Sequence, residues 1–166
     1  PGGTCSGVSN ALAIPAAGPV TLPAGATTIR TFLNGLGATG STPAEAVLRG
    51  LTTYTAGVAT PGRVAVGVFL GDGATAGTLS CTADVTTLSG ILSAHRLATG
   101  IRTFVVSFPS FTPDFATAES LALAGGGAPH ASPCPVGVNQ CRQYHVAPDT
   151  DATTARQALE STQANS

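Results

Sequence analysis

Two histidines and two cysteines form a symmetrical set late in the chain. Three residues separate His130 from Cys134, and three separate Cys141 from His145. Imidazole nitrogens and thiolate sulfurs are the usual ligands of structural zinc, so this pattern could hold a zinc ion. In an oxidising compartment the two thiols would instead bond to each other and close a small loop. We expect the Cys134–Cys141 disulfide, with zinc as the alternative.

The other two cysteines, Cys5 and Cys81, make the total even. An even count in a chain rich in Thr and Ser fits an exported protein with disulfides, whereas four free thiols would fit a cytosolic one. We expect an extracellular or cell-envelope location, in a bacterium. A Cys5–Cys81 bridge, which would fasten the N-terminal arm over the sheet predicted below, is our hypothesis.

Residues for catalysis are sparse. The segment from Gly7 to Ala11 is similar to a nucleophile elbow around Ser9, but no apolar strand leads into it. His95 falls within a predicted helix, where it is expected to pack, and a phosphate loop with a lysine is excluded because the chain has no Lys. We therefore expect a protein that is not an enzyme. A small α/β hydrolase using Ser9 and one of the three histidines is the alternative.

The composition excludes two classes of partner. Charged residues make up 9% of the chain and the net charge is −1, so no basic stripe is available to neutralise nucleic-acid phosphates. The longest apolar run, from Val64 to Leu70, is far shorter than the roughly 20 residues of a membrane span. We expect neither nucleic acid nor a membrane span.

The elements that position these residues follow from hydrophobic spacing. Residues 1–26 contain four prolines and five glycines and are expected to be irregular. After them, helices and strands should alternate. The expected helices cover residues 27–36, 42–54, 82–98, 112–124 and 150–162, and the expected strands cover 63–70, 101–108 and 143–146.

The predicted helices have recognisable ends and faces. Thr42 suits an N-cap, Pro43 the first helical position, and Glu45 the third position of a capping box. Thr112 and Pro113 should open the fourth helix in the same way. The expected buried residues are Val47, Leu48, Leu51 and Tyr54 in the second helix, Val85, Leu88, Ile91, Leu92 and His95 in the third, and Phe115, Leu121 and Leu123 in the fourth.

This alternation predicts a single α/β domain over residues 27–166. Short connections between strands and helices favour an open, mainly parallel, doubly wound (Rossmann-like) sheet with helices on both faces. The apolar strand ending at Leu70 should be central in it. Ligands of such sheets bind beyond the carboxyl ends of the strands, where Gly71, Asp72 and Gly73 follow.

The order of motifs resembles the von Willebrand factor type A (VWA) family. The resemblance rests on Gly-Ser-Thr-Pro at 40–43, an apolar strand ending in Asp72-Gly73, Gly-Ile-Arg-Thr-Phe-Val-Val at 100–106, and Leu-Ala-Leu-Ala-Gly-Gly-Gly at 121–127. It covers about residues 27–162. It implies a module that binds a protein or surface ligand through a divalent cation, usually Mg²⁺, held by oxygen ligands on three loops.

The resemblance assigns two of these loops to the chain. The threonine ligand of the family corresponds to Thr42, with Ser41 adjacent, and the aspartate ligand corresponds to Asp72, with Gly71 and Gly73 in the binding loop. Without a metal, Thr42 would be a helix cap and Asp72 a turn residue.

The first loop of the family, Asp-x-Ser-x-Ser, is missing from the 166 residues. The only carboxylate before Asp72 is Glu45, the chain contains no Met, and residues 1–26 are too short for the family's first strands. We expect an N-terminally truncated VWA-like domain that lacks its first strands and binds Mg²⁺ weakly or not at all on its own. A structural fragment without activity, prone to aggregate through an unpaired strand edge, is a further alternative.

Overall fold

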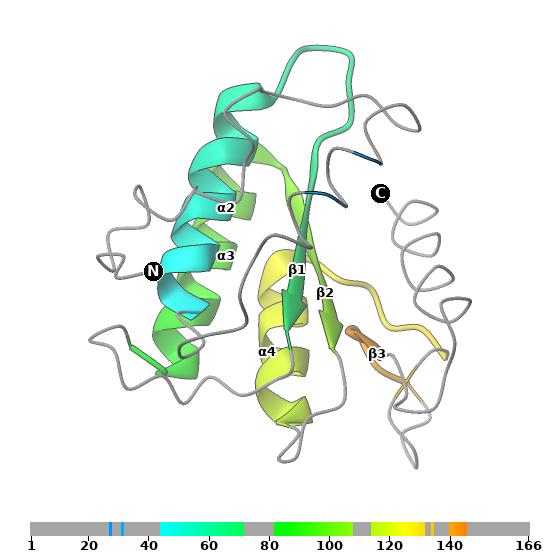
Figure 1. Cartoon of the computed structure of the whole chain (residues 1–166). Coiled ribbons are helices and arrows are strands. Elements are labelled where there is room, and N and C mark those ends of the chain that lie inside the picture. The colour runs from blue at the N-terminus through cyan, green and yellow to red at the C-terminus, as the bar shows by residue number, and fades with distance from the viewer. Residues whose placement is uncertain are drawn as a thin grey trace.

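The structure is a computed structural model of the chain. It describes residues 44–71, 82–107, 114–131 and 140–145, together with Thr27, Thr31 and Cys134. In these ranges the elements follow the order α2 (Ala44–Val58), β1 (Val66–Gly71), α3 (Val85–Thr99), β2 (Arg102–Ser107), α4 (Phe115–Gly125) and β3 (Tyr144–His145). Figure 1 shows their arrangement. This alternation confirms the α/β class.

The three described strands form one parallel sheet in the order β1, β2, β3. Val66 pairs with Arg102 at one end of the β1–β2 ladder, and Gly71 pairs with Ser107 at the other. Short β3 continues the sheet by pairing Ser107 with His145. Parallel pairing is therefore confirmed. Among the described strands the middle position belongs to β2, not to β1 as we expected from its apolar run.

All three described helices lie on one face of this sheet. α3 packs between α2 and α4, α2 contacts β1, and α4 contacts β2 (Figure 1). The core between helices and sheet is built from small and branched apolar side chains. Its largest buried members are Leu48 from α2, Phe69 from β1, Leu88 and Leu92 from α3, Val105 from β2 and Leu121 from α4.

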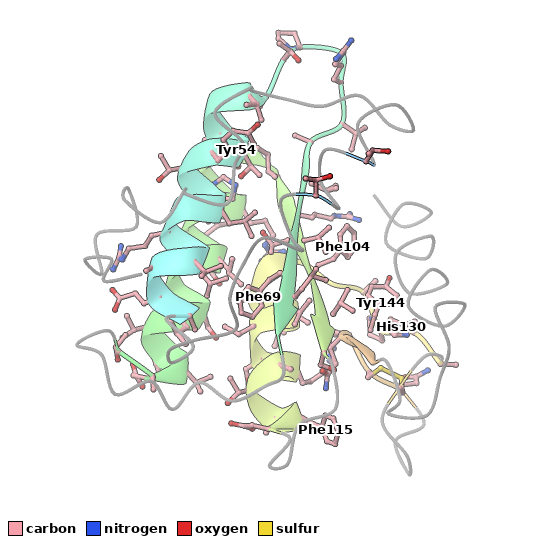
Figure 2. All side chains as sticks on the ribbon, in the orientation of Figure 1. Tyr54, Phe69, Phe104, Phe115, His130 and Tyr144 are labelled. Atoms are coloured by element: carbon pink, nitrogen blue, oxygen red, sulfur yellow. A yellow bond between two sulfur atoms is a disulfide. The ribbon has the colours of Figure 1, made fainter. Side chains whose placement is uncertain are left out.

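The opposite face of the sheet carries a second apolar cluster. Phe104, Val106 and Tyr144 are buried there, with Val66 and Val68 packed against them. Figure 2 shows the Phe104 and Tyr144 rings on the side of the strands away from Phe69, and their centroids are 6.2 Å apart. Burial on both faces explains why apolar side chains follow one another at Val68 and Phe69 of β1 and at 104–106 of β2. The helix predicted over 150–162 falls outside the described residues.

Aspartates and glycines mark the helix ends. Asp84 caps α3 by accepting the backbone N–H of Thr87 at 2.8 Å, and Asp114 caps α4 by accepting that of Thr117 at 3.0 Å. Gly100, which follows α3, has a φ of 74°, a left-handed conformation that suits glycine. The start expected at Thr112 and Pro113 was wrong, because the side chain that caps α4 belongs to Asp114.

The other predicted boundaries and faces need small corrections. Helix α2 continues four residues beyond Tyr54, and β1 begins at Val66 rather than Arg63. Val47 and Leu123, expected in the core, are 40% and 56% exposed. The expected burial of Leu48, Leu88, Leu92, His95 and Leu121 is confirmed. From the helix predicted over 27–36, only Thr27 and Thr31 are described, and both are helical and exposed.

One close contact fixes α4 against the sheet. At Gly125 a Cβ atom would clash with the carbonyl oxygen of Thr103 in β2, so only glycine fits there.

Within the described part of the chain, no helix is both long enough and apolar enough to cross a membrane.

Candidate functional site

The carboxyl edge of the sheet is where the described elements converge. The arrowheads of β1 and β2 and the first turns of α2, α3 and α4 lie at the same end of the structure (Figure 1). Helix N-termini present backbone N–H groups, and ligands of open parallel sheets bind at this edge. The arrangement therefore provides the kind of edge at which loop residues form binding sites.

The residues predicted to bind metal are next to this edge in the sequence. Asp72 directly follows Gly71, the last residue of β1, and Thr42 precedes Ala44, the first residue of α2, by two positions. Thr42, Asp72, Ser41 and Gly73 themselves fall outside the described residues. Gly71 is described, and it is half-buried and paired with Ser107.

Glu45 connects two segments of this edge. Its side chain, in the first turn of α2, is mostly buried, and its Oε2 accepts the backbone N–H of Thr82 at 2.9 Å. Its Oε1 accepts from Arg49 Nε at 2.9 Å and forms an ion pair with the same guanidinium. The Thr82 N–H, and then Arg49, lower the pKa of the Glu45 carboxyl. The carboxylate therefore ties the first turn of α2 to the segment that leads into α3.

Sequence reasoning missed this role of Glu45. We expected it to be part of a capping box with Thr42, which falls outside the described residues, and we did not expect its contact with Thr82, which lies outside α2. The only signal in the sequence was a carboxylate at the start of a helix that otherwise has a small apolar N-terminal turn. Nothing in it indicated Thr82 as the partner, 37 residues away.

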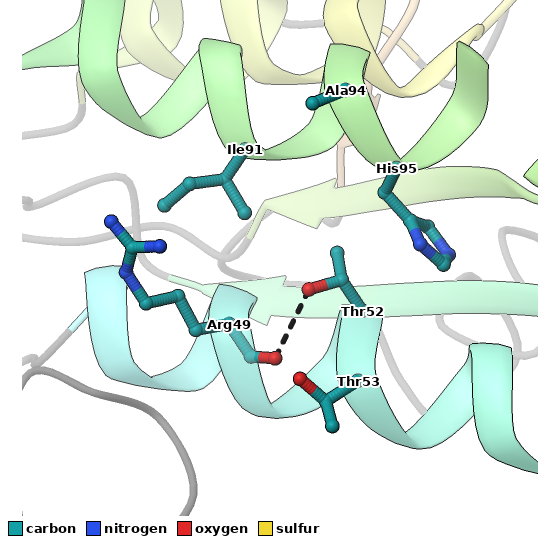
Figure 3. A pocket seen from close by; sticks show the side chains of 6 residues that line it. All are labelled: Arg49, Thr52, Thr53, Ile91, Ala94 and His95. Atoms are coloured by element: carbon teal, nitrogen blue, oxygen red, sulfur yellow. Dashed lines mark hydrogen bonds between the residues drawn. The ribbon is translucent and has the colours of Figure 1, made fainter. Parts of the chain in front are cut away.

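The side chain of His95, a residue of α3, points toward α2 and lines a hollow of about 380 Å³. Figure 3 shows this hollow, lined from α2 by Arg49, Thr52 and Thr53 and from α3 by Ile91, Ala94 and His95. The His95 Nε2 is 3.0 Å from Thr55 Oγ1. Burial lowers the pKa of the imidazole. The predicted packing role of His95 is confirmed, with a hydrogen bond added to it.

The His95–Thr55 pair is not arranged for nucleophilic catalysis. Thr55 Oγ1 lies 2.8 Å from the carbonyl oxygen of Leu51, which accepts its single proton. The hydroxyl oxygen can then accept a hydrogen bond from His95 Nε2, rather than lose its proton to it. Ser9, the other suggested nucleophile, falls outside the described residues.

The late histidine and cysteines form a second cluster, beside Tyr144 of β3. Cys134 and Cys141 are joined by a disulfide, as predicted. The His130 ring stacks on the Tyr144 ring with centroids 4.3 Å apart and planes 9° from parallel. His130 and Cys141 also pair through their backbones as an antiparallel bridge. Cys5 and Cys81 fall outside the described residues, so their bridge stays a prediction.

Compared with known protein families, curated proteins and solved structures, the chain matches none.

Proposed function

We propose that the chain is a VWA-like binding module, not an enzyme, that recognises a protein or surface ligand at the carboxyl edge of its sheet. The observation that carries the proposal is the convergence of the β1 end and the α2 first turn at that edge (Figure 1). These two elements connect directly to Asp72 and Thr42, the residues that the family resemblance assigns as metal ligands.

Several features of the described residues support this proposal. The order α2, β1, α3, β2, α4, β3 in a parallel sheet agrees with an open, Rossmann-like VWA sheet. Glu45 follows the proposed Thr42 loop in the sequence, and Thr82 follows the proposed Asp72 loop. The hydrogen bond between Glu45 and Thr82 therefore holds together the segments into which the two loops lead. A hydroxyl and a carboxylate are also the hard oxygen donors that Mg²⁺ prefers.

The proposed site is incomplete in its ligands, and this limits the expected affinity. The 166 residues contain no Asp-x-Ser-x-Ser loop. With one carboxylate and one hydroxyl, most coordination positions of a cation would be filled by water, and a dissociation constant of about 10⁻³ M or weaker is expected. Carboxylate groups of an acidic partner would then complete the coordination and strengthen binding.

Ligand capture tests the proposal. The chain is immobilised and offered a panel of acidic extracellular proteins, with Mg²⁺ or with a chelator. We expect Mg²⁺-dependent retention that is lost in Asp72→Asn but kept in Asp151→Asn, which makes the same charge change elsewhere. Retention that is the same with and without Mg²⁺, and unchanged in Asp72→Asn, would reject the proposal. Turnover in an esterase or phosphatase screen that is lost in Ser9→Ala would favour the hydrolase instead.

A further inference from the structure

The cluster of His130, Cys134 and Cys141 contains none of the residues of the proposed metal loops, and it lies beside Tyr144 of β3, on the other side of β2 from β1. All three side chains offer ligand atoms to a metal, and these atoms lie within 4.8 Å of one another. The imidazole Nδ1 is 4.0 Å from Cys134 Sγ and 3.9 Å from Cys141 Sγ. Nδ1 is therefore nearly equidistant from the two sulfurs, and Cys141 Sγ is also 3.9 Å from Nε2.

These distances are close to those of a zinc site. With Zn–S of about 2.3 Å and Zn–N of about 2.0 Å at tetrahedral angles, each sulfur would lie about 3.5 Å from the nitrogen. The sulfurs would lie about 3.8 Å from each other, so the disulfide must first be broken. Once the sulfurs separate, each nitrogen–sulfur distance would shorten by about half an ångström, and the imidazole would turn so that one nitrogen points at the metal.

The backbone around the cluster keeps two of the three groups in place without the disulfide. His130 N donates to Cys141 O at 2.8 Å, and Cys141 N donates to His130 O at 3.0 Å. The next residue, Arg142, donates its backbone N–H to Glu119 Oε2 of α4 at 2.7 Å. Stacking on the buried Tyr144 ring further fixes the orientation of the imidazole.

The two sulfurs also differ in exposure. Cys134 is half-buried, whereas Cys141 is 3% exposed. A reductant therefore reaches the disulfide from the Cys134 side.

We propose that reduction of the Cys134–Cys141 disulfide creates a zinc site formed by these two thiolates and the His130 imidazole. A phosphine reductant transfers two electrons to the S–S bond, becomes its oxide with oxygen from water, and leaves one proton on each sulfur. Zinc then binds both sulfurs as thiolates, and the two protons are released to solvent. Water fills the fourth position. The oxidised chain is the zinc-free state, and the reduced chain is the zinc-binding state.

The test compares oxidised and phosphine-reduced full chains by zinc titration against a chromophoric chelator. The reduced chain should bind one equivalent of zinc at this cluster and the oxidised chain none. Cobalt substituted for zinc should give a thiolate-to-metal charge-transfer band only after reduction. If reduction adds no metal binding, or if cobalt binds without that band, the proposal is overturned.

Two variants assign the binding to this cluster. His130→Phe keeps an aromatic ring to stack on Tyr144 but removes the nitrogen ligands, and zinc affinity should fall about tenfold or more. The double variant Cys5→Ser/Cys81→Ser should retain zinc binding, since it changes only the other cysteines. Unchanged affinity in His130→Phe would overturn the assignment. So would loss of binding in a folded double variant, with folding checked by circular dichroism.

Discussion

At the scale of single residues, Glu45 and His95 show how much depends on individual polar groups in a chain with few charges. Each is mostly buried, and each joins α2 to the elements beside it. Glu45 accepts hydrogen bonds with both carboxylate oxygens, and His95 meets the Thr55 hydroxyl across the helix interface. Changes at these residues should therefore alter stability more than ordinary surface changes.

The first residue-scale prediction is that Glu45→Gln destabilises the protein at neutral pH. It replaces a carboxylate that holds Arg49 and the Thr82 N–H with a neutral amide that has only one acceptor oxygen. A loss of about 1–2 kcal/mol in the free energy of unfolding is expected from urea denaturation. Glu160→Gln, the same chemical change elsewhere, is the control. Equal stability of the two variants would contradict the role assigned to Glu45.

The same carboxylate should produce a pH dependence. Because the folded-state pKa of Glu45 is lowered, its contribution is complete above the unfolded value of about 4.3 and is lost as the pH falls through the folded value. The gap in stability between the wild-type chain and Glu45→Gln should therefore narrow in acid. A stability gap that widens below about pH 4 would show that folding does not lower the pKa of Glu45.

His95 makes a separate prediction in a higher pH range. Burial lowers its folded-state pKa, so the unfolded chain takes up a proton first as the pH falls. Stability from this group is complete above about pH 6.5 and declines below it toward the folded-state pKa. His95→Gln, which keeps a donor for Thr55 but does not titrate, should lose less stability between about pH 7.5 and about pH 5.5. An identical decline in both proteins would reject the assignment to His95.

At the scale of elements, glycine at Gly125 permits the contact between α4 and β2. A methyl group there would clash with a backbone carbonyl of the sheet, which has no room to move. At Gly90, on the exposed side of α3, an added Cβ atom would meet nothing within 4 Å. An alanine side chain therefore has room at Gly90 but not at Gly125.

This difference predicts opposite effects of one substitution. Gly125→Ala should cost about 2 kcal/mol or more in the free energy of unfolding, because α4 must move away from Thr103. Gly90→Ala should instead raise stability by up to about 1 kcal/mol, because alanine favours helix. Thermal or urea unfolding measures both. Similar effects of the two changes would contradict the close packing of α4 on β2.

The elements also show how far the sequence could predict the structure. Apolar spacing located α2, α3, α4 and the strands β1 and β2, because residues such as Leu48, Leu92 and Val105 repeat at the periods of buried faces. It misplaced Val47 and Leu123, because small residues such as Ala46 and Ala122 provide the tight interior contacts in their helices. At the candidate site, the Glu45–Thr82 contact was beyond prediction, since it depends on tertiary packing between distant segments.

At the scale of the whole molecule, the parallel sheet places β1 and the β3 strand, beside which the Cys134–Cys141 disulfide lies, on opposite sides of β2. The disulfide was predictable because two nearby cysteines in a chain rich in Ser and Thr indicate oxidising conditions. The stacking of His130 on Tyr144 was not, because it depends on how β3 joins the sheet. The carboxyl edge is the position that we propose binds Mg²⁺ and, through it, a protein or surface ligand.

The most direct test of that proposal is a Mn²⁺ titration followed by paramagnetic broadening of backbone amide resonances. We predict that the first amides to broaden are those nearest Asp72 and Thr42, which among the described residues are Gly71, Ala44 and Glu45. The broadening should disappear in Asp72→Asn and persist in Asp151→Asn. Broadening centred elsewhere, or equally strong at Gly71 in Asp72→Asn, would contradict the proposal.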